Sequence, residues 1–356
     1  MPLRLARRDD DVRHDVTVRA FVISGPKQAS VVDVEPPTPS RGRVVVDVER
    51  VGVCGTDMEL FAGTMPYLLE GHERYPLRPG HEWAGTVSSI GPDVDETWLG
   101  ARVTGDTMLG CGECARCRRG KHHVCENRYE IGIRGGWPGA LAEQLLVPAS
   151  ALHRLPETMS WTTGALVEPA GCALRAVEAA QIGAGDRVCV WGPGTLGLLS
   201  MQFAAARGAI VDVVGIDEPR LALAASLGAN EAVRFDDLRD GRRYAAVIDA
   251  STSSEASARA IKQVEPAGRI VLVGIAPGPS LIDTRALVFN DVAVIGILAA
   301  SAGLSGAIEL LGSGAIRTEP LVAATVGLDD VADVLAGRRP DHAGPGPKIQ
   351  VDPRRR

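Results

Sequence analysis

The feature that most constrains the fold is a glycine-rich stretch near the middle of the chain. Residues 187–191 (RVCVW) form an apolar run typical of a buried strand, and residues 192–197 read GPGTLG. The apolar stretch LLSMQFAAARG follows directly and is typical of a helix. The pattern G-x-G-x-x-G is weak by itself, but between a strand and a helix it indicates a turn that binds a dinucleotide.

Each residue of this turn has a physical role. Gly192 allows the tight turn, Gly194 lets a pyrophosphate approach the backbone, and Gly197 brings the helix close to the strand. Thr195 and Leu196 open the helix, whose N-terminus stabilises the phosphate charge. These five residues are the cofactor-binding residues that we predict in the turn.

Strand-like and helix-like stretches alternate after the turn. We expect strands at 210–216, 246–250, 269–274 and 292–297, and helices at 219–227 and 254–264. Such alternation predicts an α/β unit with a doubly wound parallel sheet, whose ligands bind at the carboxyl ends of the strands. Gly274 ends one of these strands and is a further candidate for the cofactor site.

Four cysteines lie within fifteen residues, namely Cys111, Cys114, Cys117 and Cys125. Two consecutive Cys-x-x-Cys steps let backbone N–H groups point at the sulfurs, and the fourth thiolate closes a tetrahedron. The set predicts a closed structural Zn²⁺ site. An iron–sulfur cluster or a pair of disulfides are the alternatives. We expect His122 and His123 to be exposed polar residues, because four thiolates already saturate the metal.

A second group of metal-binding residue types precedes this stretch. Residues 51–57 read VGVCGTD and residues 79–85 read PGHEWAG, which offer the thiolate of Cys54, the imidazole of His81 and the carboxylate of Glu82. Three protein ligands with a vacant fourth position describe a catalytic zinc. The hydroxyl of Thr56 could then pass a proton from an alcohol bound to the metal.

A further acid, Glu168, stands where the sequence changes to the alanine-rich helical stretch 162–180. Its carboxylate could reach the zinc or a water bound to it. Each of these groups also has a structural alternative. Cys54 could be a small buried side chain near a turn, His81 and Glu82 a helix-capping or surface pair, and Glu168 an acid that interacts with a helix dipole.

The two ends of the chain have a different texture. We expect short strands at 17–23, 29–34, 43–53, 84–90 and 101–104, which give an irregular, mostly β domain. The tail at 299–356 contains helix-like stretches at 305–311 and 329–335 and a strand-like stretch at 348–351, and we expect it to return to this first domain. Residues 1–16 mix charges without periodicity and are expected to form a flexible extension.

Composition excludes several classes of protein. The chain has 356 residues and a net charge of −6, and only 4% of its residues are aromatic, so we expect no nucleic-acid partner and no anionic lipid surface. Residues 1–15 lack the apolar segment of a signal peptide, and no apolar run is long enough to span a bilayer. Clustered thiols favour a reducing cytoplasm.

Together these motifs resemble the zinc-dependent medium-chain dehydrogenases, over residues 17–353. The resemblance rests on the residues around Cys54 and Thr56, on Gly80-His81-Glu82, on the four-cysteine stretch, on Glu168-Pro169 and on the turn 192–197. It implies a GroES-like, mostly β catalytic domain at 17–165 and 300–356, with an inserted Rossmann domain at 166–299. It also implies two zinc ions in each chain, one catalytic and one structural, and assembly into homodimers or homotetramers.

The resemblance further implies the ligands of the catalytic zinc. These are Cys54, His81 and a carboxylate, for which Glu82 and Glu168 are both candidates. The acid at Glu168 is typical of the branch that contains sorbitol, threonine and other polyol dehydrogenases, whereas a cysteine is usual there in the alcohol-dehydrogenase branch. Relatives often carry a histidine of the proton relay where this chain has Glu59, so a solvent path or Glu59 itself could replace it.

Two alignments put different residues at the position that would bind the adenosine ribose. Asp217 lies twenty residues after Gly197, which suits a bond to the ribose 2′-hydroxyl and therefore NAD. An ungapped alignment through the next helix instead puts Gly215 at that place, which would admit NADP with Arg220 near its phosphate. We predict NAD, with NADP as the alternative. A structural role for Asp217, as the acid that opens a helix, is also open.

From these residues we predict an enzyme that oxidises a secondary alcohol to a ketone with a nicotinamide cofactor. The resemblance favours a polyol, cyclitol, sugar or amino alcohol as the small-molecule substrate. One alternative is a zinc-free quinone or enoyl reductase of the same architecture. A more distant alternative is a binding protein that only senses the cofactor.

Overall fold

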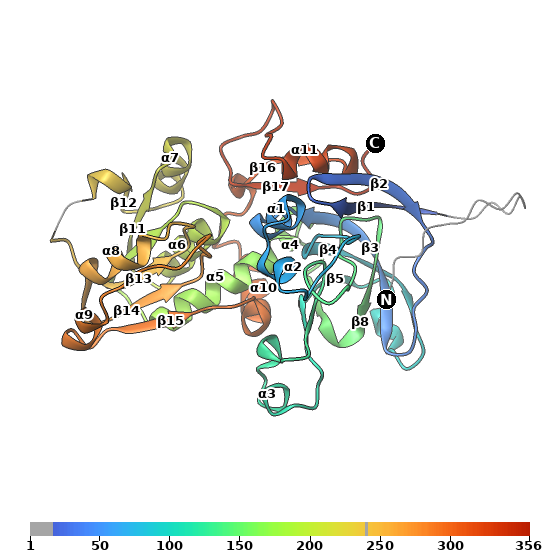
Figure 1. The fold of residues 1–356 in the computed structure, drawn as a ribbon, viewed down its shortest axis with the longest axis horizontal. Coiled ribbons are helices and arrows are strands. Elements are labelled where there is room, and N and C mark those ends of the chain that lie inside the picture. Colours follow the sequence, from blue (N-terminus) through green and yellow to red (C-terminus); the bar gives the residue numbers. More distant parts are fainter. Residues whose placement is uncertain (1–16, 239–240) are drawn as a thin grey trace, which may run out of the picture. The chain divides into compact units, whose positions relative to one another are not determined.

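The computed structural model describes residues 17–238 and 241–356, and these divide into two compact units (Figure 1). The first unit comprises Met1–Glu168, Ala324–Ala343 and Lys348–Arg356, and the second comprises Pro169–Ala323 and Gly344–Pro347. The second unit is therefore an insertion between the two ends of the chain. The predicted flexible extension at 1–16 lies outside the described residues.

The first unit is built on a seven-stranded sheet in the order β16-β17-β3-β4-β5-β9, with β8 also paired to β3. The strands of this sheet are β3 (Arg43–Gly52), β4 (Glu82–Ile90), β5 (Arg102–Gly105), β8 (Gln144–Pro148), β9 (Leu152–Arg154), β16 (Val322–Val326) and β17 (Lys348–Val351). Two smaller pairs are β1 (Val18–Gly25) with β2 (Gln28–Val34), and β6 (Met108–Leu109) with β7 (Tyr129–Glu130). The β-branched residues of β3 explain its central place, because its valines are buried.

The helices of the first unit are short. They are α1 (Gly55–Ala62), α2 (Pro66–Leu69), α3 (Ala115–Arg118), α4 (Trp161–Gly164) and α11 (Val331–Leu335). No helix is predicted from the sequence directly after Cys54, but the structure begins α1 there. The helix starts because the Asp57 carboxylate accepts a hydrogen bond from the backbone N–H of Cys54 at 2.9 Å, which ties the first turn together.

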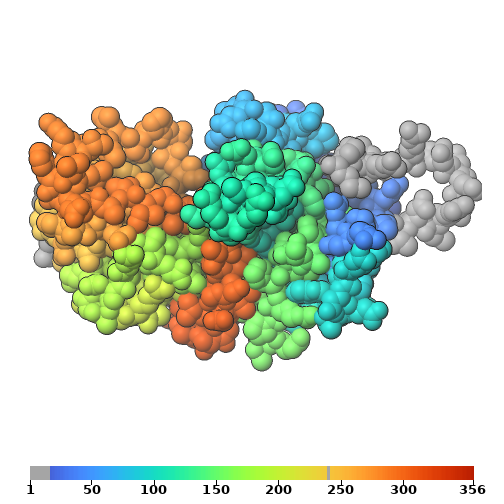
Figure 2. Space-filling model, turned by 90° about the horizontal axis from the view of Figure 1, so that it is seen from below, coloured from blue at the N-terminus to red at the C-terminus, as the bar shows by residue number. Residues whose placement is uncertain are grey.

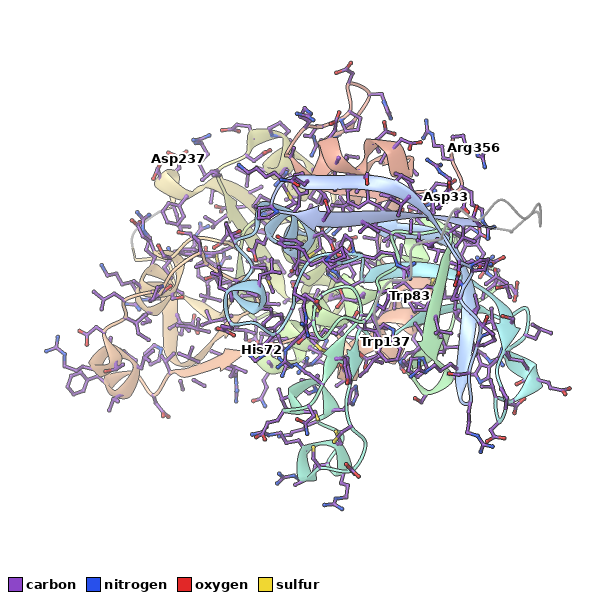
Figure 3. All side chains as sticks on the ribbon, turned by 45° about the vertical axis from the view of Figure 1, so that its right-hand side comes forward. Asp33, His72, Trp83, Trp137, Asp237 and Arg356 are labelled. Atoms are coloured by element: carbon purple, nitrogen blue, oxygen red, sulfur yellow. The ribbon has the colours of Figure 1, made fainter. Side chains whose placement is uncertain are left out.

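The four-cysteine lobe, residues 111–125, extends from the sheet of the first unit. Figure 1 shows α3 at its tip, and Figure 2 shows its surface facing the viewer. Figure 3 shows several sulfur atoms close together in this lobe. The same figure labels Trp83, which belongs to the first unit. Trp83 on β4 is almost fully buried, and Gly105 makes room for it, since a Cβ there would lie 2.6 Å from the indole.

The second unit is a six-stranded parallel sheet in the order β12-β11-β10-β13-β14-β15, which confirms the predicted doubly wound sheet. Its strands are β10 (Arg187–Trp191), β11 (Ile210–Gly215), β12 (Glu231–Arg234), β13 (Tyr244–Asp249), β14 (Val264–Leu272) and β15 (Ala293–Gly296). The order reverses between β10 and β13, and a ligand crevice is expected at that point.

The helices of the second unit follow its strands. They are α6 (Thr195–Ala206), α7 (Glu218–Ser226), α8 (Ala256–Gln263), α9 (Thr284–Phe289) and α10 (Leu304–Gly312). A further helix, α5 (Val167–Ala180), begins at the boundary between the units. Single 3₁₀ turns occur at Glu96–Trp98, His122–Val124, Ala149–Ala151, Phe235–Asp237, Ser301–Gly303, Glu319–Leu321 and Leu328–Asp330. The core of the unit packs Trp191, Tyr244 and Val247 against Ile261 of α8.

Some predicted elements differ from the structure. The helix expected over 162–180 is two helices, α4 and α5, because Ser160 caps the first and its last turn ends at Ala165. The strand expected at 210–216 ends at Gly215, since Asp217 already caps the next helix. Within the described residues, no helix has the length and apolar character needed to cross a membrane.

Candidate metal and cofactor sites

The first unit brings Cys54, His81 and Glu82 together. One possible ligand atom from each of the three lies within 4.8 Å of the others. Two paired strands explain this meeting, because β3 runs antiparallel to β4 with Gly52 opposite Glu82. Gly52 also leaves space, since a Cβ there would lie 2.1 Å from Oε2 of Glu82.

Asp57 orients two of these three residues. Its Oδ2 accepts the N–H of Cys54 at 2.9 Å, and its Oδ1 accepts the N–H of Gly80 at 3.1 Å. The same Oδ1 lies 3.5 Å from Nδ1 of His81. Asp57 is not among the site residues predicted from the sequence, although an acid three residues after Cys54 is a signal for a residue that caps the next helix.

Lys348 forms an ion pair with Glu82, the third residue of the group. Its Nζ lies 2.8 Å from Oε1 and 2.7 Å from Oε2 of Glu82, and it also donates to the carbonyl of Val53 at 3.0 Å. Lys348 is only 4% exposed, so this is a buried ion pair. Sequence reasoning placed Lys348 on a strand and missed this role, because nothing local links it to Glu82.

The charges of the group act on one another. Burial lowers the pKa of His81, but the Asp57 carboxylate and the Cys54 thiol raise it, and the net pKa lies well above its usual value. Burial raises the pKa of Asp57, yet the partner His81 and two backbone N–H groups bring that pKa below its usual value. The group is therefore a tightly coupled set of buried charges.

Glu168 lies outside this group of three but close to it. It stands in the first turn of α5 and is 8% exposed. Burial raises the pKa of Glu168 to about 7, with opposing effects of His81, which lowers it, and Glu82, which raises it. The structure thus places Glu168 within electrostatic range of both residues.

Thr56 and Glu59 lie on α1. The Oγ1 of Thr56 is 3.9 Å from Sγ of Cys54. Glu59 follows Thr56 by three positions, so the two side chains share one face of the helix. Burial raises the pKa of Glu59 above its usual value. Glu59 is not part of the metal-binding group.

The donors at this site suit a zinc ion. A thiolate, an imidazole and a carboxylate are the ligand types that zinc takes in catalytic sites. Nδ1 of His81 faces Oδ1 of Asp57 at 3.5 Å, and Oε2 of Glu82 faces Nζ of Lys348 at 2.7 Å, so the fit to zinc rests on the chemistry of the three donor types.

The four cysteines of the lobe also lie within 4.8 Å of one another, and all are free thiols. The Sγ atoms of Cys111 and Cys117 are 3.9 Å apart, and those of Cys114 and Cys125 are 3.8 Å apart. Sulfurs at the corners of a tetrahedron around zinc, with bonds of about 2.3 Å, lie about 3.8 Å apart. The spacing fits a closed zinc site and does not fit a disulfide.

Backbone N–H groups point at these sulfurs, as the Cys-x-x-Cys steps predict. The N–H of Cys114 lies 3.4 Å from Sγ of Cys111, and the N–H of Cys117 lies 3.4 Å from Sγ of Cys114. The second contact lowers the pKa of the Cys114 thiol to about 6. His122 departs from the exposed state that we expected, because its Nε2 lies 2.7 Å from Oδ2 of Asp106 and the ring is partly buried.

The glycine-rich turn of the second unit has the geometry of a phosphate site. Gly192 has φ of +92°, and a Cβ at Gly197 would lie 1.9 Å from the carbonyl oxygen of Gly192. A Cβ at Gly194 would meet nothing within 4 Å, so this position faces open space. Gly194 caps α6 without a side-chain hydrogen bond, and Thr195 and Leu196 follow at the helix N-terminus, where free N–H groups bind anions.

The two candidate positions for recognition of the adenosine ribose, Gly215 and Asp217, both lie at or just after the end of β11. Gly215 is its last residue, and a Cβ there would lie 2.5 Å from Cδ of Pro193, so no side chain fits. Asp217 caps α7, because its Oδ1 accepts the N–H of Arg220 at 3.0 Å. Gly274 follows β14 and packs against Ser251, whose carbonyl oxygen would lie 1.9 Å from a Cβ at that glycine.

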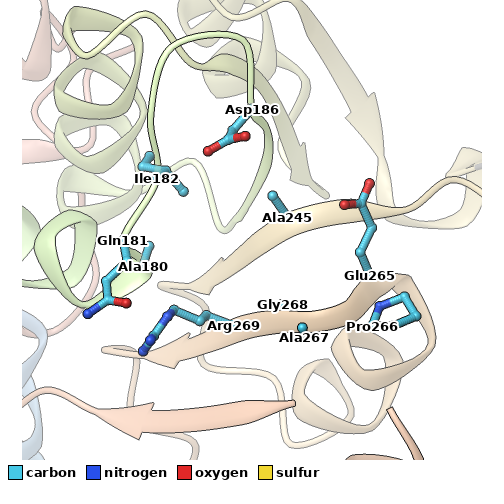
Figure 4. Close-up of a pocket in the computed structure, with 10 residues that line it drawn as sticks. All are labelled: Ala180, Gln181, Ile182, Asp186, Ala245, Glu265, Pro266, Ala267, Gly268 and Arg269. Atoms are coloured by element: carbon cyan, nitrogen blue, oxygen red, sulfur yellow. The ribbon is translucent and has the colours of Figure 1, made fainter. Parts of the chain in front are cut away.

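A surface cavity of about 310 Å³ lies elsewhere in the second unit (Figure 4). Asp186, Ala245 and Glu265 line it, and these residues stand at the amino ends of β10, β13 and β14. Ligands of a doubly wound sheet bind at the opposite, carboxyl edge. The cavity is therefore not the cofactor site.

Comparisons with known proteins agree with this geometry. Residues 40–157 match the alcohol dehydrogenase GroES-like domain family, and residues 195–313 match the zinc-binding dehydrogenase family. The L-threonine 3-dehydrogenase of Pyrococcus horikoshii is 33% identical, over 76% of this chain and 79% of the relative. The chain is thus similar to zinc-type dehydrogenases over both of its units.

Two solved structures share the whole architecture. One is an alcohol dehydrogenase (RspB) of Escherichia coli CFT073 with NADH, which is 27% identical with a TM-score of 0.85 and covers 94% of this chain and 99% of its own. The other is a zinc-binding dehydrogenase of Sinorhizobium meliloti 1021 with NADP, which is 29% identical with a TM-score of 0.87 and covers 95% and 100%.

The chain therefore belongs to the zinc-dependent medium-chain dehydrogenases, in the branch of the threonine and polyol dehydrogenases. It is a zinc-type oxidoreductase that acts on small-molecule alcohols and uses a nicotinamide cofactor. The GroES-like fold and the Rossmann fold that the sequence predicts are both confirmed.

Proposed function

We propose that this protein oxidises a secondary alcohol of the polyol, cyclitol, sugar or amino-alcohol class to the ketone, reversibly and with NAD. The observation that carries the proposal is the buried group of Cys54, His81 and Glu82 in the first unit. The relative that acts on threonine supports an amino alcohol or a similar hydroxyl compound as substrate.

We assign the catalytic metal to Cys54, His81 and Glu168. Both oxygens of Glu82 face the ammonium of Lys348, at 2.8 and 2.7 Å, so a cation bound to Glu82 would share that carboxylate with a buried positive charge. Glu168 is buried and near the same residues. Zinc bound there would supply a Lewis acid that lowers the pKa of a substrate hydroxyl.

The chain's own residues then handle the proton. Thr56 lies 3.9 Å from Cys54 and can accept the proton of a substrate hydroxyl while it donates its own. Glu59, one turn further along α1, is half-buried with a raised pKa, and it can carry that proton toward solvent in place of a histidine. The proposed relay is therefore Thr56, Glu59 and solvent.

We assign Asp217 to the adenosine ribose of the cofactor and Gly274 to its nicotinamide half. The residues assigned to the pyrophosphate are Gly192, Gly194, Thr195, Leu196 and Gly197. The NAD preference is supported by Asp217, which follows the last residue of β11 by two positions and would repel a 2′-phosphate. The relative with bound NADP makes NADP the alternative.

We further propose that the first unit, with boundaries near 165 and 300, is the catalytic domain, and that the chain forms homodimers or homotetramers. Apolar side chains are exposed around the edge strand β15, among them Leu281 (90%), Val288 (78%) and Phe289 (85%). An exposed edge with such a patch is suited to pairing with a second copy. The clustered thiols support a cytoplasmic location.

The test is a screen of the purified protein against polyols, cyclitols, sugars and amino alcohols, with NADH fluorescence as the readout. We expect turnover with one of these classes, and loss of all turnover in Cys54→Ala while the circular dichroism spectrum is unchanged. Turnover that persists after chelation would instead support the zinc-free quinone or enoyl reductase. Cofactor binding without turnover across the whole set would support a binding protein.

A further inference from the structure

One guanidinium in the second unit holds a turn at the carboxyl edge of the sheet. The side chain of Arg175 on α5 donates through Nη1 to the carbonyl oxygens of Leu298 and Ala299. These residues come directly after β15, which ends at Gly296. Ala299 has φ of +63°, a left-handed conformation that is uncommon for a residue with a side chain.

The helix and the turn approach each other closely around this contact. A Cβ at Gly171 would lie 2.8 Å from Cβ of Ala300, and a Cβ at Gly303 would lie 2.3 Å from the carbonyl oxygen of Gly171. The same Cβ at Gly303 would lie 3.0 Å from Cγ of Arg175. The turn is therefore fixed from one side by backbone contact and by the stem of Arg175.

The contact also fixes which way the peptide N–H groups of the turn point. In a trans peptide the carbonyl and the following N–H point in opposite directions. The carbonyls of Leu298 and Ala299 face Arg175, so the N–H groups of Ala299 and Ala300 face away from it. Neither N–H has an acceptor within the part of the chain that the structure describes, although Ala300 is buried.

The position of the turn says what those N–H groups could bind. A doubly wound sheet consists of two halves, each of which takes one mononucleotide of the cofactor. The glycine-rich turn after β10 and Asp217 after β11 assign the adenosine half to β10, β11 and β12. The nicotinamide half then falls at the carboxyl ends of β13, β14 and β15, where this turn lies.

We propose that Arg175 is a positioning residue, which holds the turn after β15 so that the N–H groups of Ala299 and Ala300 donate to the carboxamide of the nicotinamide ring. The proposal rests on the proposed function only in so far as the protein binds a nicotinamide dinucleotide. Arg175 itself touches no cofactor atom in this role.

The test compares two ligands that differ by the nicotinamide. NADH and ADP-ribose are titrated calorimetrically into the wild-type protein and into Arg175→Ala, Arg175→Lys and Arg207→Ala. Arg207 is the matched control, because its guanidinium lies 3.7 Å from Glu178 on the same helix α5 and contacts no residue of the turn. A residue that only supports the fold would alter both ligands alike.

We expect Arg175→Ala to weaken NADH about tenfold or more, as loss of charged hydrogen bonds to two carbonyls implies, and to leave ADP-ribose within twofold. Arg175→Lys should recover part of the NADH affinity, and Arg207→Ala should match the wild type. Unchanged NADH affinity, or equal losses of NADH and ADP-ribose in both Arg175 variants, would overturn the proposal. A wild-type protein that binds both ligands but turns over no alcohol would refute the proposed function and leave this test readable.

Discussion

The ammonium of Lys348 lies 2.8 Å from Oε1 of Glu82, a residue 266 positions earlier in the chain. Both side chains are almost completely buried. Burial lowers the pKa of Lys348, but Glu82 and Cys54 raise it, and the net pKa is above its usual value. The Lys348 ammonium therefore stays charged at neutral pH, next to the proposed metal site.

Removing one partner of this pair should cost more than removing both. Lys348→Met leaves the Glu82 charge buried and uncompensated, which typically destabilises by about 3 to 5 kcal/mol. The double variant Glu82→Gln with Lys348→Met leaves no charge, so its free energy of unfolding should lie closer to the wild type. Denaturant unfolding of the wild type, the two single variants Glu82→Gln and Lys348→Met, and the double variant gives the coupling energy, and strictly additive losses would contradict a direct pair.

Zinc content distinguishes the two candidate carboxylate ligands. The wild-type protein should hold two zinc ions per chain, one for each metal-binding group. Glu168→Gln should retain about one, because it removes a proposed ligand, whereas Glu82→Gln should retain both. Metal analysis of dialysed protein provides the count. The reverse pattern would assign the ligand role to Glu82.

The raised pKa of Glu168 predicts a pH-dependent stability in the metal-free protein. The folded pKa of about 7 lies above the unfolded value of 4.5, so between these pH values the folded state binds more protons. Stability due to this group is then complete below about pH 4.5 and falls as pH rises through 7, by at most about 3 kcal/mol. Glu168→Gln should lack this component.

The measurement is denaturant unfolding of both proteins from pH 4.5 to 8 after identical chelation. The difference between wild type and Glu168→Gln isolates the group, because His81 and Asp57 titrate in both. The wild type should lose stability relative to the variant as the pH increases. A constant difference across this range would show that Glu168 is not protonated in the folded state.

Asp217 offers a way to change the cofactor preference without losing the helix cap. Asparagine caps helices as well as aspartate does, so Asp217→Asn should keep α7 and remove one negative charge near the ribose. We expect kcat/KM for NADP relative to NAD to rise several-fold. Asp217→Ala is the control for the cap, since it should cost about 1 kcal/mol of stability. An unchanged ratio in both variants would place ribose recognition elsewhere.

The cysteine lobe should act locally. Cys114→Ser should remove one zinc ion per chain and make residues 111–125 sensitive to proteolysis, because the metal is the main link within the lobe. Cofactor binding, measured by NADH fluorescence, should persist, since the residues proposed for it belong to the other unit. Cys172 belongs to neither metal-binding group, so the control variant Cys172→Ser should keep both zinc ions.

Sequence reasoning succeeded where the determinants are local. The four cysteines, the turn at Gly192 and the strand–helix alternation are patterns within short windows, and the structure reproduces the parallel sheet that they predict. The pairing of Glu82 with Lys348 could not be predicted, because it depends on strand order across the whole chain. The sequence alone left two residues, Asp217 and Gly215, as candidates for the position that binds the ribose. Only the structure shows that the space around Gly215 admits no side chain at the end of β11.

The pairing of β17 with β3 has a consequence for synthesis of the chain. The inserted unit is complete in sequence when residue 347 has been made, so it can fold while translation continues. The unit that holds the buried ion pair must wait for Lys348–Arg356. A chain truncated after Pro347 should already bind nucleotide, yet its proposed reaction centre should still be unfinished.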